Sequence, residues 1–514
     1  MIRRILATAA AALIAVSLGG ATPAAAESKP EQWRGYWVDA FNQGIYTSEQ
    51  VAKLVGEAKK VNANALIVQS VRRYDCFCNR ALYPRTDAAI SPAPYDPLDE
   101  IVDKAHEAGL EVHAWINVNT MWNSATAPKS PDHVYNAHGL TAEGADRWLN
   151  KRADGSEKIG NNTYIDPANP AAANYIVDGI KSVLAEYDVD GVNLDYVRYP
   201  DFNSNTSHSD WGYSEVSLAR FQAATGRTDV PAPDDQQFSD WRRTQMTNLV
   251  RKIYLGMWSV DPGARLSMDG ITYGYGPQSV GGWEKTRTYA EVLQDWKGWQ
   301  DEGIMDTVVA MNYKRNWMPD QAQMYSEWTE VLADYQGDRQ AVIGPALYLN
   351  SVSDSVAQVR EALRPTAAGN TAAGWSGYSY ANPSREALGQ PADVKDAERD
   401  KLAAALTTGE DAPFADDAAV PVMPWKADPT EGHIAGRVTT DDTAADQATV
   451  VLRPLGAGEV QRRSTDGDGW YGFVHLAPGR YLVRVELPDG TAGDPARVVT
   501  VKAGKISTAD IALS

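Results

Sequence analysis

Short apolar runs that alternate with helical patterns occupy most of this chain. Eight runs of aliphatic, β-branched or aromatic residues have the length of strands. They are Gly35–Phe41, Ala65–Ser70, Glu111–Val118, Gly191–Tyr199, Arg265–Thr272, Thr307–Lys314, Ala341–Leu349 and Gly374–Tyr380. Helical patterns lie between them, at Thr47–Val61, Pro97–Gly109, Pro170–Tyr187, Asp240–Val260, Thr288–Glu302, Pro319–Tyr335 and Asp354–Leu363. An eight-fold alternation predicts an α/β fold, a (β/α)8 TIM barrel.

A doubly wound open sheet is the alternative for such an alternation. It fits less well because no Gly-rich phosphate turn follows the first strand-like run, where a dinucleotide-binding fold needs one. Asp96 and Asn169 each precede a proline, which is typical of a capped helix start. In a barrel, side chains at the C-terminal ends of the strands are the first functional candidates.

The two ends of the chain depart from the barrel pattern. Residues 1–26 combine Arg3 and Arg4 with an apolar run and a closing Ala24-Ala25-Ala26, which is typical of a signal peptide and too short for a membrane anchor. We therefore expect a secreted, extracellular protein whose barrel spans residues 27–406. Residues 407–430 are rich in Pro, Ala and Asp and indicate a linker or a strap over the barrel. Residues 431–514 alternate with a period of two, which predicts a small all-β sandwich.

Composition narrows the classes of partner. Lys and Arg number 48 against 67 Asp and Glu, a formal charge of −19 that repels nucleic acid and anionic membrane surfaces. The chain has 16 Trp and 24 Tyr but only 7 Phe, so most of its aromatic rings carry a polar group. Such rings pack on C–H groups while still hydrogen bonding, which suits sugars as well as a large core. Sugars therefore fit these rings, and the family resemblance described below implies a polysaccharide or glycan strand as the partner.

Metal and redox chemistry have little support in the sequence. Cys76 and Cys78 are the only cysteines, and they either form a disulfide across a small ring or remain as thiols that are free or packed. The histidines form no HExxH pattern, and the two cysteines lack the spacing of a zinc site. Asp466 and Asp468 lie in a Gly-containing turn, for which a hairpin is a better interpretation than a calcium site. We expect no metal and no cofactor.

The fourth strand-like run carries the strongest chemical signal. Asn193 and Asp195 have the same parity, so they share one face of the strand and would point toward the barrel axis. A carboxylate in that position is costly unless it lies at the mouth and meets partners. We predict that Asp195 is catalytic, with a buried structural pair to Arg198 as the alternative. Asp190 precedes the strand and is interpreted as a cap or turn residue.

If the barrel cleaves glycosidic bonds, as the family resemblance described below implies, a second carboxylate is needed beside the first. Asp269 is the first candidate, because it ends the fifth run and is followed by Gly270, which allows close approach to a ligand. Asp39 on the first run is the reserve candidate, and a turn or cap role is the alternative for both residues. Whichever group serves as the acid needs a raised pKa.

Further polar and aromatic residues near the strand ends are candidates for sugar binding. His113 is interpreted as a proton shuttle or as a histidine that fixes a neighbouring aspartate. Arg73 and Arg198 either bind a lactyl carboxylate of muramic acid or neutralise Asp75 and Asp195. Tyr273 and Trp375 either stack under a sugar or line the barrel. The full set is Asp39, Gln69, Arg73, His113, Trp115, Asn117, Arg198, Tyr273, Asn312, Tyr313 and Trp375.

Several separated motifs resemble one known family. Arg34-Gly-Tyr-Trp37, Val68-Gln69, Asp96-Pro-Leu98, the stretch from His106 to Asn117 and the stretch Tyr187–Pro200 are similar to the bacterial glycosyl-hydrolase-like 10 family, in the same order. The resemblance covers about residues 33 to 380. It implies a glycosidase barrel that acts outside the cytoplasm, in some members on peptidoglycan strands stripped of their peptides. Residues 465–481 resemble the carboxypeptidase-regulatory-like and prealbumin-like sandwich modules of exported enzymes.

A looser resemblance concerns chitinase-type barrels. Aligned on the Asp-Gly-x-Asp-x-Asp-x-Glu pattern of those enzymes, Asp190–Val197 places Val197 where the proton-donating Glu stands. The acid must then come from another strand, or the barrel binds glycans without cutting them. We therefore expect a secreted glycoside hydrolase with Asp195 and Asp269 as its catalytic pair. A glycan-binding barrel without hydrolysis is the alternative.

Overall fold

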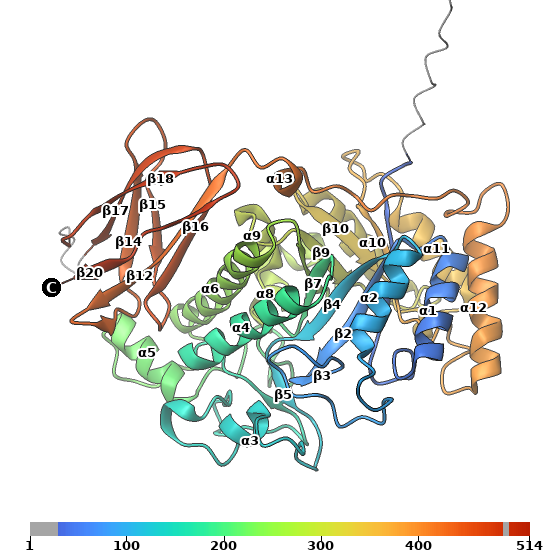
Figure 1. Cartoon of the computed structure of the whole chain (residues 1–514), viewed down its shortest axis with the longest axis horizontal. Coiled ribbons are helices and arrows are strands. Elements are labelled where there is room, and N and C mark those ends of the chain that lie inside the picture. Colours follow the sequence, from blue (N-terminus) through green and yellow to red (C-terminus); the bar gives the residue numbers. More distant parts are fainter. Residues whose placement is uncertain (1–28, 487–492, 514) are drawn as a thin grey trace, which may run out of the picture.

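The structure is a computed structural model that describes residues 29–486 and 493–513; the expected signal peptide lies outside this part of the chain. Eight parallel strands form a closed barrel in the order β1-β2-β4-β7-β8-β9-β10-β11, with β11 returning to β1 (Figure 1). Their bounds are β1 Trp33–Val38, β2 Ala65–Arg72, β4 Glu111–Asn117, β7 Gly191–Asp195, β8 Arg265–Ile271, β9 Thr307–Met311, β10 Gln340–Gly344 and β11 Gly374–Tyr378. The predicted (β/α)8 barrel is therefore confirmed.

Side chains alternate between the barrel axis and the surrounding helices, as expected from strand geometry. On β8, Leu266 and Met268 belong to the core between strands and helices, while Asp269 faces the interior. The interior of the barrel is filled by bulky apolar side chains that form a separate cluster, namely Trp33, Trp37, Ala65, Ile67, Trp115, Val309 and Val342. Because this cluster plugs the barrel, polar side chains can collect only at its ends.

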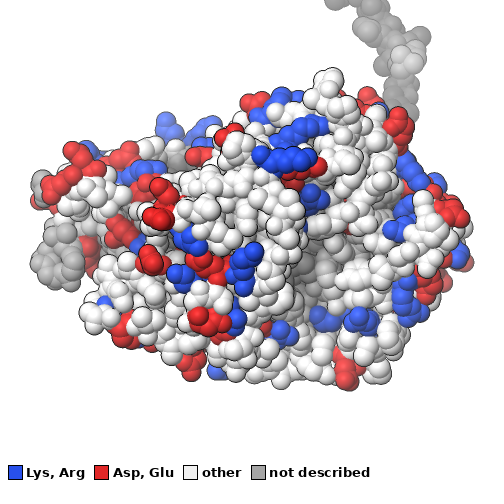
Figure 2. Space-filling model, turned by 90° about the horizontal axis from the view of Figure 1, so that it is seen from below, with Lys and Arg blue, Asp and Glu red and all other residues white. Residues whose placement is uncertain are grey.

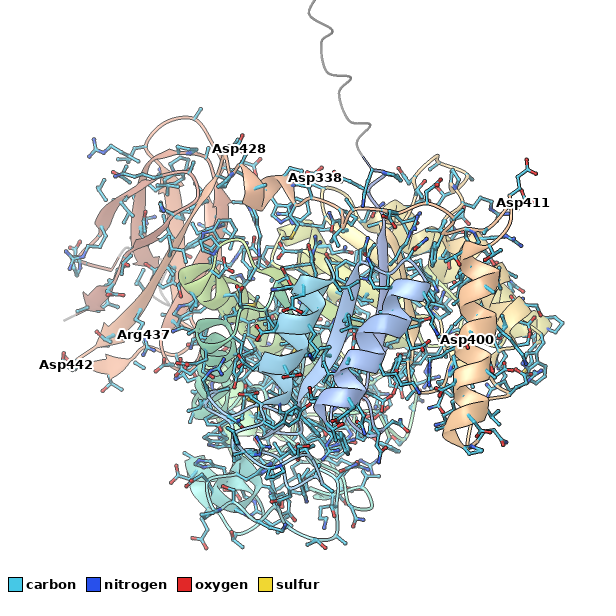
Figure 3. The ribbon with its side chains drawn as sticks, turned by 45° about the vertical axis from the view of Figure 1, so that its right-hand side comes forward. Asp338, Asp400, Asp411, Asp428, Arg437 and Asp442 are labelled. Carbon is cyan, nitrogen blue, oxygen red and sulfur yellow. A yellow bond between two sulfur atoms is a disulfide. The ribbon has the colours of Figure 1, made fainter. Side chains whose placement is uncertain are left out.

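Helices cover the outside of the barrel. They include α1 Ser48–Lys60, α2 Pro97–Glu107, α4 Pro170–Glu186, α6 Gln236–Val260, α10 Pro319–Tyr335, α11 Val352–Ala362 and α12 Ala392–Thr407. The predicted caps are present, since Asp96 and Asn169 accept hydrogen bonds from backbone N–H groups in the first turns of α2 and α4. At the outer edge, Asp400 of α12 pairs with Lys60 of α1 at 2.8 Å (Figure 3).

One predicted helix, 288–302, is interrupted. It divides into α8 Arg287–Ala290 and α9 Trp296–Glu302. Leu293 between them has φ 52°, in the left-handed region that bulky residues avoid. The side chain of Gln294 accepts a hydrogen bond from Ile271 N at 2.8 Å, and Asp295 caps α9 by accepting from Gly298 N. These tertiary and capping contacts end one helix and begin the next.

Long connections follow several strands at the C-terminal end of the barrel. The β4–α4 connection contains β5 Thr120–Trp122, α3 Val134–His138, the 3-10 helix η1 Gly144–Asp146 and β6 Thr163–Tyr164. Other connections contain β3 Asp75–Cys76, α5 Glu215–Thr225, α7 Pro277–Val280, η2 Trp283–Lys285 and η3 Leu347–Leu349. Cys76 and Cys78 are joined in a disulfide beside β3, which is the first of the two alternatives that the sequence left open. Both sulfurs are buried, and burial of the loop brings them together.

Residues 407–430 form an ordered strap across the N-terminal end of the barrel. The strap contains α13 Pro424–Ala427, and it is anchored by Asp306, which is fully buried. Asp306 accepts a hydrogen bond from Trp425 Nε1 at 2.7 Å and pairs with Lys426 Nζ at 2.7 Å. A buried charge that is paired in this way is costly to disturb, so the strap is part of the barrel structure.

The C-terminal part of the chain forms two sheets that enclose their own apolar core, which confirms the predicted all-β unit. Their strands are β12 Gly432–Thr440, β13 Thr443–Ala444, β14 Thr449–Pro454, β15 Gln461–Ser464, β16 Trp470–Leu476, β17 Gly479–Glu486, β18 Arg497–Val501, β19 Ile506–Thr508 and β20 Ile511–Leu513. Figure 1 shows this sandwich beside α5 and α6. Arg220 of α5 pairs with Asp446 at 2.7 Å, and Lys252 of α6 pairs with Asp466 at 2.7 Å.

The turn at Asp466 is a structural turn. Asp466 Oδ1 accepts hydrogen bonds from the backbone N–H groups of Asp468 and Trp470, each at 2.9 Å. Within residues 29–486 and 493–513, no cluster of three or more His, Cys, Asp or Glu side chains is arranged to hold a metal ion. In the same part of the chain, none of the helices combines the length and the apolar character needed to cross a bilayer.

Candidate active site

A cavity of about 350 Å³ opens at the C-terminal ends of the barrel strands. Figure 2 shows the molecule from this side, with a hollow near the middle of the face. Both predicted carboxylates, Asp195 and Asp269, line this cavity, although they come from different strands. The other lining residues are Phe41, Gln69, Arg73, Trp115, Asn117, Tyr196, Arg198, Asp201, Ile271, Tyr273, Met311, Tyr313, Lys314, Tyr348 and Tyr378.

Asp195 is held by hydrogen bonds to both of its oxygens. Oδ2 accepts from Trp115 Nε1 at 3.1 Å and from Asn117 Nδ2 at 2.7 Å, while Oδ1 accepts from Tyr196 N at 2.7 Å. The side chain is only 6% exposed. Three donors fix the carboxylate in one orientation and favour its charged form.

A second layer of hydrogen bonds fixes Asn117. Its Oδ1 accepts from Gln69 Nε2 at 3.1 Å and from Arg73 N at 3.2 Å, so its Nδ2 must point at Asp195. Gln69 in turn accepts from Ala40 N at 2.9 Å. The predicted residues Gln69, Trp115 and Asn117 therefore lie in the cavity, where they orient the carboxylate of Asp195.

Asp269 has a different environment. Its Oδ1 accepts a hydrogen bond from Trp37 Nε1 at 3.0 Å, and the side chain is 2% exposed. Burial raises the pKa of Asp269 well above its ordinary value, and the negative charge of Asp195 raises it further. No cation offsets these two effects among the described neighbours that act on it. The protonated form of Asp269 is therefore favoured.

Positive charge distinguishes the two carboxylates. Burial also raises the pKa of Asp195, but the guanidinium groups of Arg198 and Arg73 and the hydrogen bonds from Tyr196 N and Trp115 Nε1 lower it. The two groups are close enough for the charge of one to raise the pKa of the other, so they titrate as a pair. Within that pair, Asp195 is the group that ionises first and Asp269 is the group that keeps the proton.

Three cationic side chains line the cavity. Arg198 lies 3.6 Å from Asp201, so it pairs with that residue, and no direct ion pair with Asp195 forms. Burial lowers the pKa of Lys314 to about 8, and its Nζ donates to Thr272 O at 2.7 Å. Arg73 lies over the ring of Phe41, 4.9 Å from its centroid, and its buried Nε has no hydrogen-bond partner among the described residues. Burial raises the pKa of Asp75, and the charges of Arg72 and Arg73 oppose that change, with Arg72 forming the ion pair at 3.2 Å.

Aromatic rings form much of the remaining wall. Tyr313 and Tyr378 are stacked with their centroids 5.1 Å apart, and Tyr273 donates to Asp201 Oδ2 at 3.1 Å. Around the mouth, the loops after β1, β7 and β9 each expose an aromatic side chain: Phe41 is 50% exposed, Phe202 52% and Trp317 51%. Exposed rings beside a polar cavity suit contact with the C–H faces of sugars.

His113 lies at the wrong end of the barrel to contact a substrate in this cavity. It pairs in register with Gly191, the first residue of β7, and it precedes Asn117 by four residues, about 13 Å along a strand. Its Nε2 lies 3.1 Å from Glu111 Oε2, and its side chain is fully buried. The prediction that it shuttles protons or fixes an aspartate is therefore wrong.

Three other predicted binding residues have structural roles. Asp39 Oδ1 accepts hydrogen bonds from the N–H groups of Phe41 and Asn42 and from Asn42 Nδ2, so its carboxylate closes a turn and does not line the cavity. Asn312 is fully buried and donates to Tyr325 O at 3.0 Å, which fastens α10 to β9. Trp375 is fully buried among the side chains between strands and helices.

Sequence reasoning missed several lining residues. Tyr378 supplies the ring that Trp375 was expected to supply, because the two residues point to opposite sides of β11. Tyr348 and Lys314 follow strands and were included in the predicted runs, but no spacing marked them. Tyr196 adopts a left-handed conformation, φ 53°, which turns its ring into the cavity against strand alternation.

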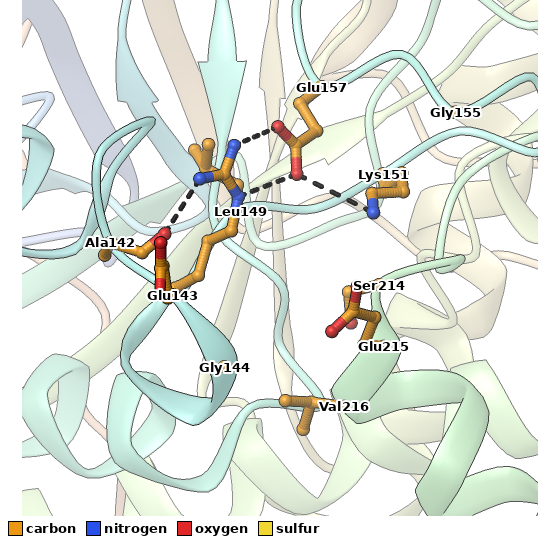
Figure 4. A pocket seen from close by; sticks show the side chains of 11 residues that line it. Ala142, Glu143, Gly144, Leu149, Lys151, Gly155, Glu157, Ser214, Glu215 and Val216 are labelled. Atoms are coloured by element: carbon orange, nitrogen blue, oxygen red, sulfur yellow. Dashed lines mark hydrogen bonds and ion pairs between the residues drawn. The ribbon is translucent and has the colours of Figure 1, made fainter.

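A separate hollow, which contains no candidate residue, lies outside the barrel mouth between η1 and the start of α5 (Figure 4). Arg147 bridges Leu140, Ala142 and Glu157, with its Nε 2.9 Å from Glu157 Oε1, and Lys151 lies 4.0 Å from the same carboxylate. Its charged groups thus largely satisfy one another. None of the predicted catalytic or binding residues lines it.

Comparison with known proteins supports the fold and the family. The chain is similar to the glycosyl hydrolase YngK of Bacillus subtilis (strain 168), with 25% identity over 290 residues, 53% of this chain and 50% of that protein. It is similar to the glycosyl hydrolase DigH of Escherichia coli (strain K12), with 24% identity over 246 residues, 43% of this chain and 46% of that protein. The chain spans about half the length of these curated relatives.

A solved structure and two family matches complete the comparison. The catalytic domain of β-amylase from Paenibacillus polymyxa matches with a TM-score of 0.50 and 10% identity, over 73% of this chain and 98% of that one, and so shares the barrel fold. Residues 433–514 match the carboxypeptidase regulatory-like domain. Residues 32–354 match the family described as glycosyl hydrolase-like 10, and the chain therefore belongs to that family.

Proposed function

We propose that this protein is a secreted glycoside hydrolase that cuts a polysaccharide with Asp195 and Asp269. One observation carries the proposal: two buried carboxylates line one cavity, and only Asp195 has cations among the groups that lower its pKa. Hydrolysis of an acetal needs one protonated and one ionised carboxyl group at neutral pH. Asp269 favours the protonated form and Asp195 favours the ionised form, as this reaction requires.

The roles follow from the proton positions. Asp269 keeps its proton and delivers it to the oxygen of the leaving sugar, after which its carboxylate can act as a base. Asp195, ionised and oriented by Trp115, Asn117 and Tyr196 N, either attacks the anomeric carbon or stabilises its developing positive charge. Trp37 keeps Asp269 in place without ionising it, because neutral donors offset burial only in part.

The cations of the cavity support a substrate that carries carboxylate groups. Arg73 exposes a guanidinium to the cavity without a carboxylate partner within 4 Å among the described residues, and Lys314 contacts a backbone carbonyl. A planar guanidinium is well suited to a carboxylate. The lactyl ether of muramic acid in cell-wall glycan strands supplies such a group. Tyr313 and Tyr378 would pack on the sugar faces.

Export is part of the proposal. It is supported by the composition of residues 1–26, with two arginines, an apolar run and three closing alanines. Expression of the full chain and comparison of its N-terminus in medium and cells would test it.

Turnover of glycan strands tests the catalytic proposal. Peptide-free cell-wall strands and chitin oligomers are incubated with the wild-type chain, Asp195→Asn and Asp269→Asn, and products are separated by chromatography. Each substitution should reduce turnover by about 10²–10⁴-fold, because it removes one of two cooperating groups. Asp178→Asn on the outer face of α4 is the matched control and should retain wild-type turnover.

Binding distinguishes the alternative function. If all four proteins bind glycan strands equally and none releases products, the barrel is a glycan-binding module without hydrolysis. If the wild type turns over substrate and Asp195→Asn does so equally well, the assigned carboxylate pair is wrong.

A further inference from the structure

A second polar cavity of about 320 Å³ lies beside the candidate active site, where the β1–α1 loop meets the starts of α1 and α12. It is lined by carboxamide groups from three separate segments, namely Asn42, Gln43, Gln50 and Gln390. Carboxamides both donate and accept hydrogen bonds, as sugar hydroxyl and N-acetyl groups do. The lining thus has the chemistry of a sugar-binding site.

The two cavities share a wall. Phe41 lines the active-site cavity and its neighbour Asn42 lines the second one. Likewise, Tyr378 lines the active-site cavity and Tyr380 lines the second one. Asp39 connects the two linings, because it accepts hydrogen bonds from Phe41 N at 3.2 Å and from Asn42 Nδ2 at 2.7 Å. A glycan chain that extends from the active site past Phe41 therefore runs toward Asn42 and the second cavity.

The second cavity also carries an excess of positive charge. Lys53, Lys395 and Arg399 line it, and the nearby carboxylate of Asp396 is shared by Lys53, at 2.6 Å, and Arg399. Lys395 has no ion pair among the described residues. This local excess stands out in a chain whose formal charge is −19.

The environment of Arg399 is a second, independent observation in favour of a ligand at this cavity. The residue is 8% exposed, its Nη1 donates to Tyr380 O at 3.2 Å, and its buried Nε has no hydrogen-bond partner among the described residues. Nearby, α12 begins at Ala392, which lines the cavity, and its N-cap Pro391 provides no side-chain cap. Unsatisfied backbone N–H groups at a helix start favour an anion.

We propose that this cavity is a distal subsite that binds a carboxylate-bearing sugar of the same glycan chain whose bond is cut at Asp195 and Asp269. The inference rests on the proposed function, and it adds that the enzyme holds its substrate across more than one subsite. Carboxamides bind the hydroxyl and amide groups, while Lys395 binds the carboxylate. Chains that reach both cavities bind more tightly than chains that fill only the first.

Binding by the full chain tests the subsite without requiring turnover. In the Asp195→Asn background, titration calorimetry compares short and long peptide-free cell-wall strands, each with native or reduced carboxyl groups. Lys395→Gln should weaken binding of long carboxylate-bearing strands about tenfold, as expected for loss of one charged contact. Binding of short strands and of carboxyl-reduced strands should not change.

A matched control separates local contact from general charge. Lys59→Gln removes the same charge from the last turn of α1, at the opposite end of that helix from the cavity. It should leave binding of long strands unchanged. Equal weakening by Lys59→Gln and Lys395→Gln, or no weakening by Lys395→Gln, would overturn the subsite.

Turnover separates this inference from the proposed function. If wild-type protein cuts long strands and Lys395→Gln cuts them with unchanged KM, the distal subsite is wrong while the proposed function stands. If no strand is cut but long carboxylate-bearing strands bind through Lys395, the cavity binds glycans and the proposed hydrolysis is wrong.

Discussion

Asp195 and Asp269 should differ in how much their ionisation lowers the free energy of unfolding. Burial and the charge of Asp195 raise the pKa of Asp269 well above its ordinary value. The folded protein then holds this proton more tightly than the unfolded chain, so stability falls as the pH rises from the unfolded pKa to the folded pKa. Asp269→Asn removes the ionisable group and keeps an oxygen that can accept from Trp37 Nε1. The variant should therefore be more stable than wild type at neutral pH.

The size of the effect follows from proton affinity. Each tenfold difference in proton affinity between folded and unfolded states is about 1.4 kcal/mol. The gain for Asp269→Asn should therefore grow as the pH rises above the ordinary carboxyl pKa and be present at neutral pH. The gain should vanish near pH 3, below the ordinary carboxyl pKa of about 3.9, because the carboxyl group is then protonated in both states.

Asp195→Asn is the matched comparison. Burial raises the pKa of Asp195 as well, but Arg198 and Arg73 oppose the change. An amide has one acceptor oxygen, so it cannot accept from Tyr196 N on one side and from Trp115 and Asn117 on the other. Loss of one hydrogen bond to a charged group costs about 1.5–3 kcal/mol. Asp269→Asn should therefore be the more stable variant by roughly this amount.

Thermal unfolding of the full chain, followed by circular dichroism between acidic and neutral pH, measures both variants. In a domain as large as the barrel, roughly 1–2 °C of melting temperature corresponds to 1 kcal/mol. Equal stabilisation by the two substitutions, or a gain for Asp269→Asn that persists at the lowest pH, would refute the assigned difference between the carboxylates.

Three further predictions concern the cavity and the strap. The pH profile of kcat should fall on the alkaline side as Asp269 loses its proton. Arg198→Gln should move the acidic limb of that profile to higher pH, because the Arg198 cation lowers the pKa of Asp195. An unmoved acidic limb would contradict the role of Arg198. Arg73→Gln should raise KM about tenfold for carboxylate-bearing strands and leave carboxyl-reduced strands unaffected, and kinetics on both substrates would show it. Asp306→Asn should destabilise the barrel by about 3–5 kcal/mol in chemical unfolding, because it leaves Lys426 buried without its counter-charge; a near-neutral effect would mean that the strap is held by its other contacts.

Local pattern in the sequence was enough to predict the barrel. Each strand of the barrel begins within about two residues of its predicted start. The prediction succeeds because a buried parallel strand consists of a short run of apolar and β-branched residues. The alternation that placed Asn193 and Asp195 on the inner face is a local property of extended backbone. It holds on β7 and β8, where Asp195 and Asp269 reach one cavity.

The alternation did not predict how far along the barrel axis each side chain lies. His113, Trp115 and Asn117 share parity on β4, yet His113 pairs with Glu111 near the N-terminal end while the other two reach Asp195. Beyond the strand ends, alternation no longer applies, so Asn312 turns toward α10. The pairing of Cys76 with Cys78 likewise depends on how the loop after β2 folds.

The sequence by itself determined the closed barrel, the appended sandwich and the two carboxylates at the strand ends, because these follow from local periodicity and chain order. Only the tertiary structure decided that Arg198 and Arg73 surround Asp195 while Asp269 meets Trp37 and a neighbouring carboxylate. The physical reason is that a pKa depends on charges and burial contributed by several strands, which come together only when the barrel closes.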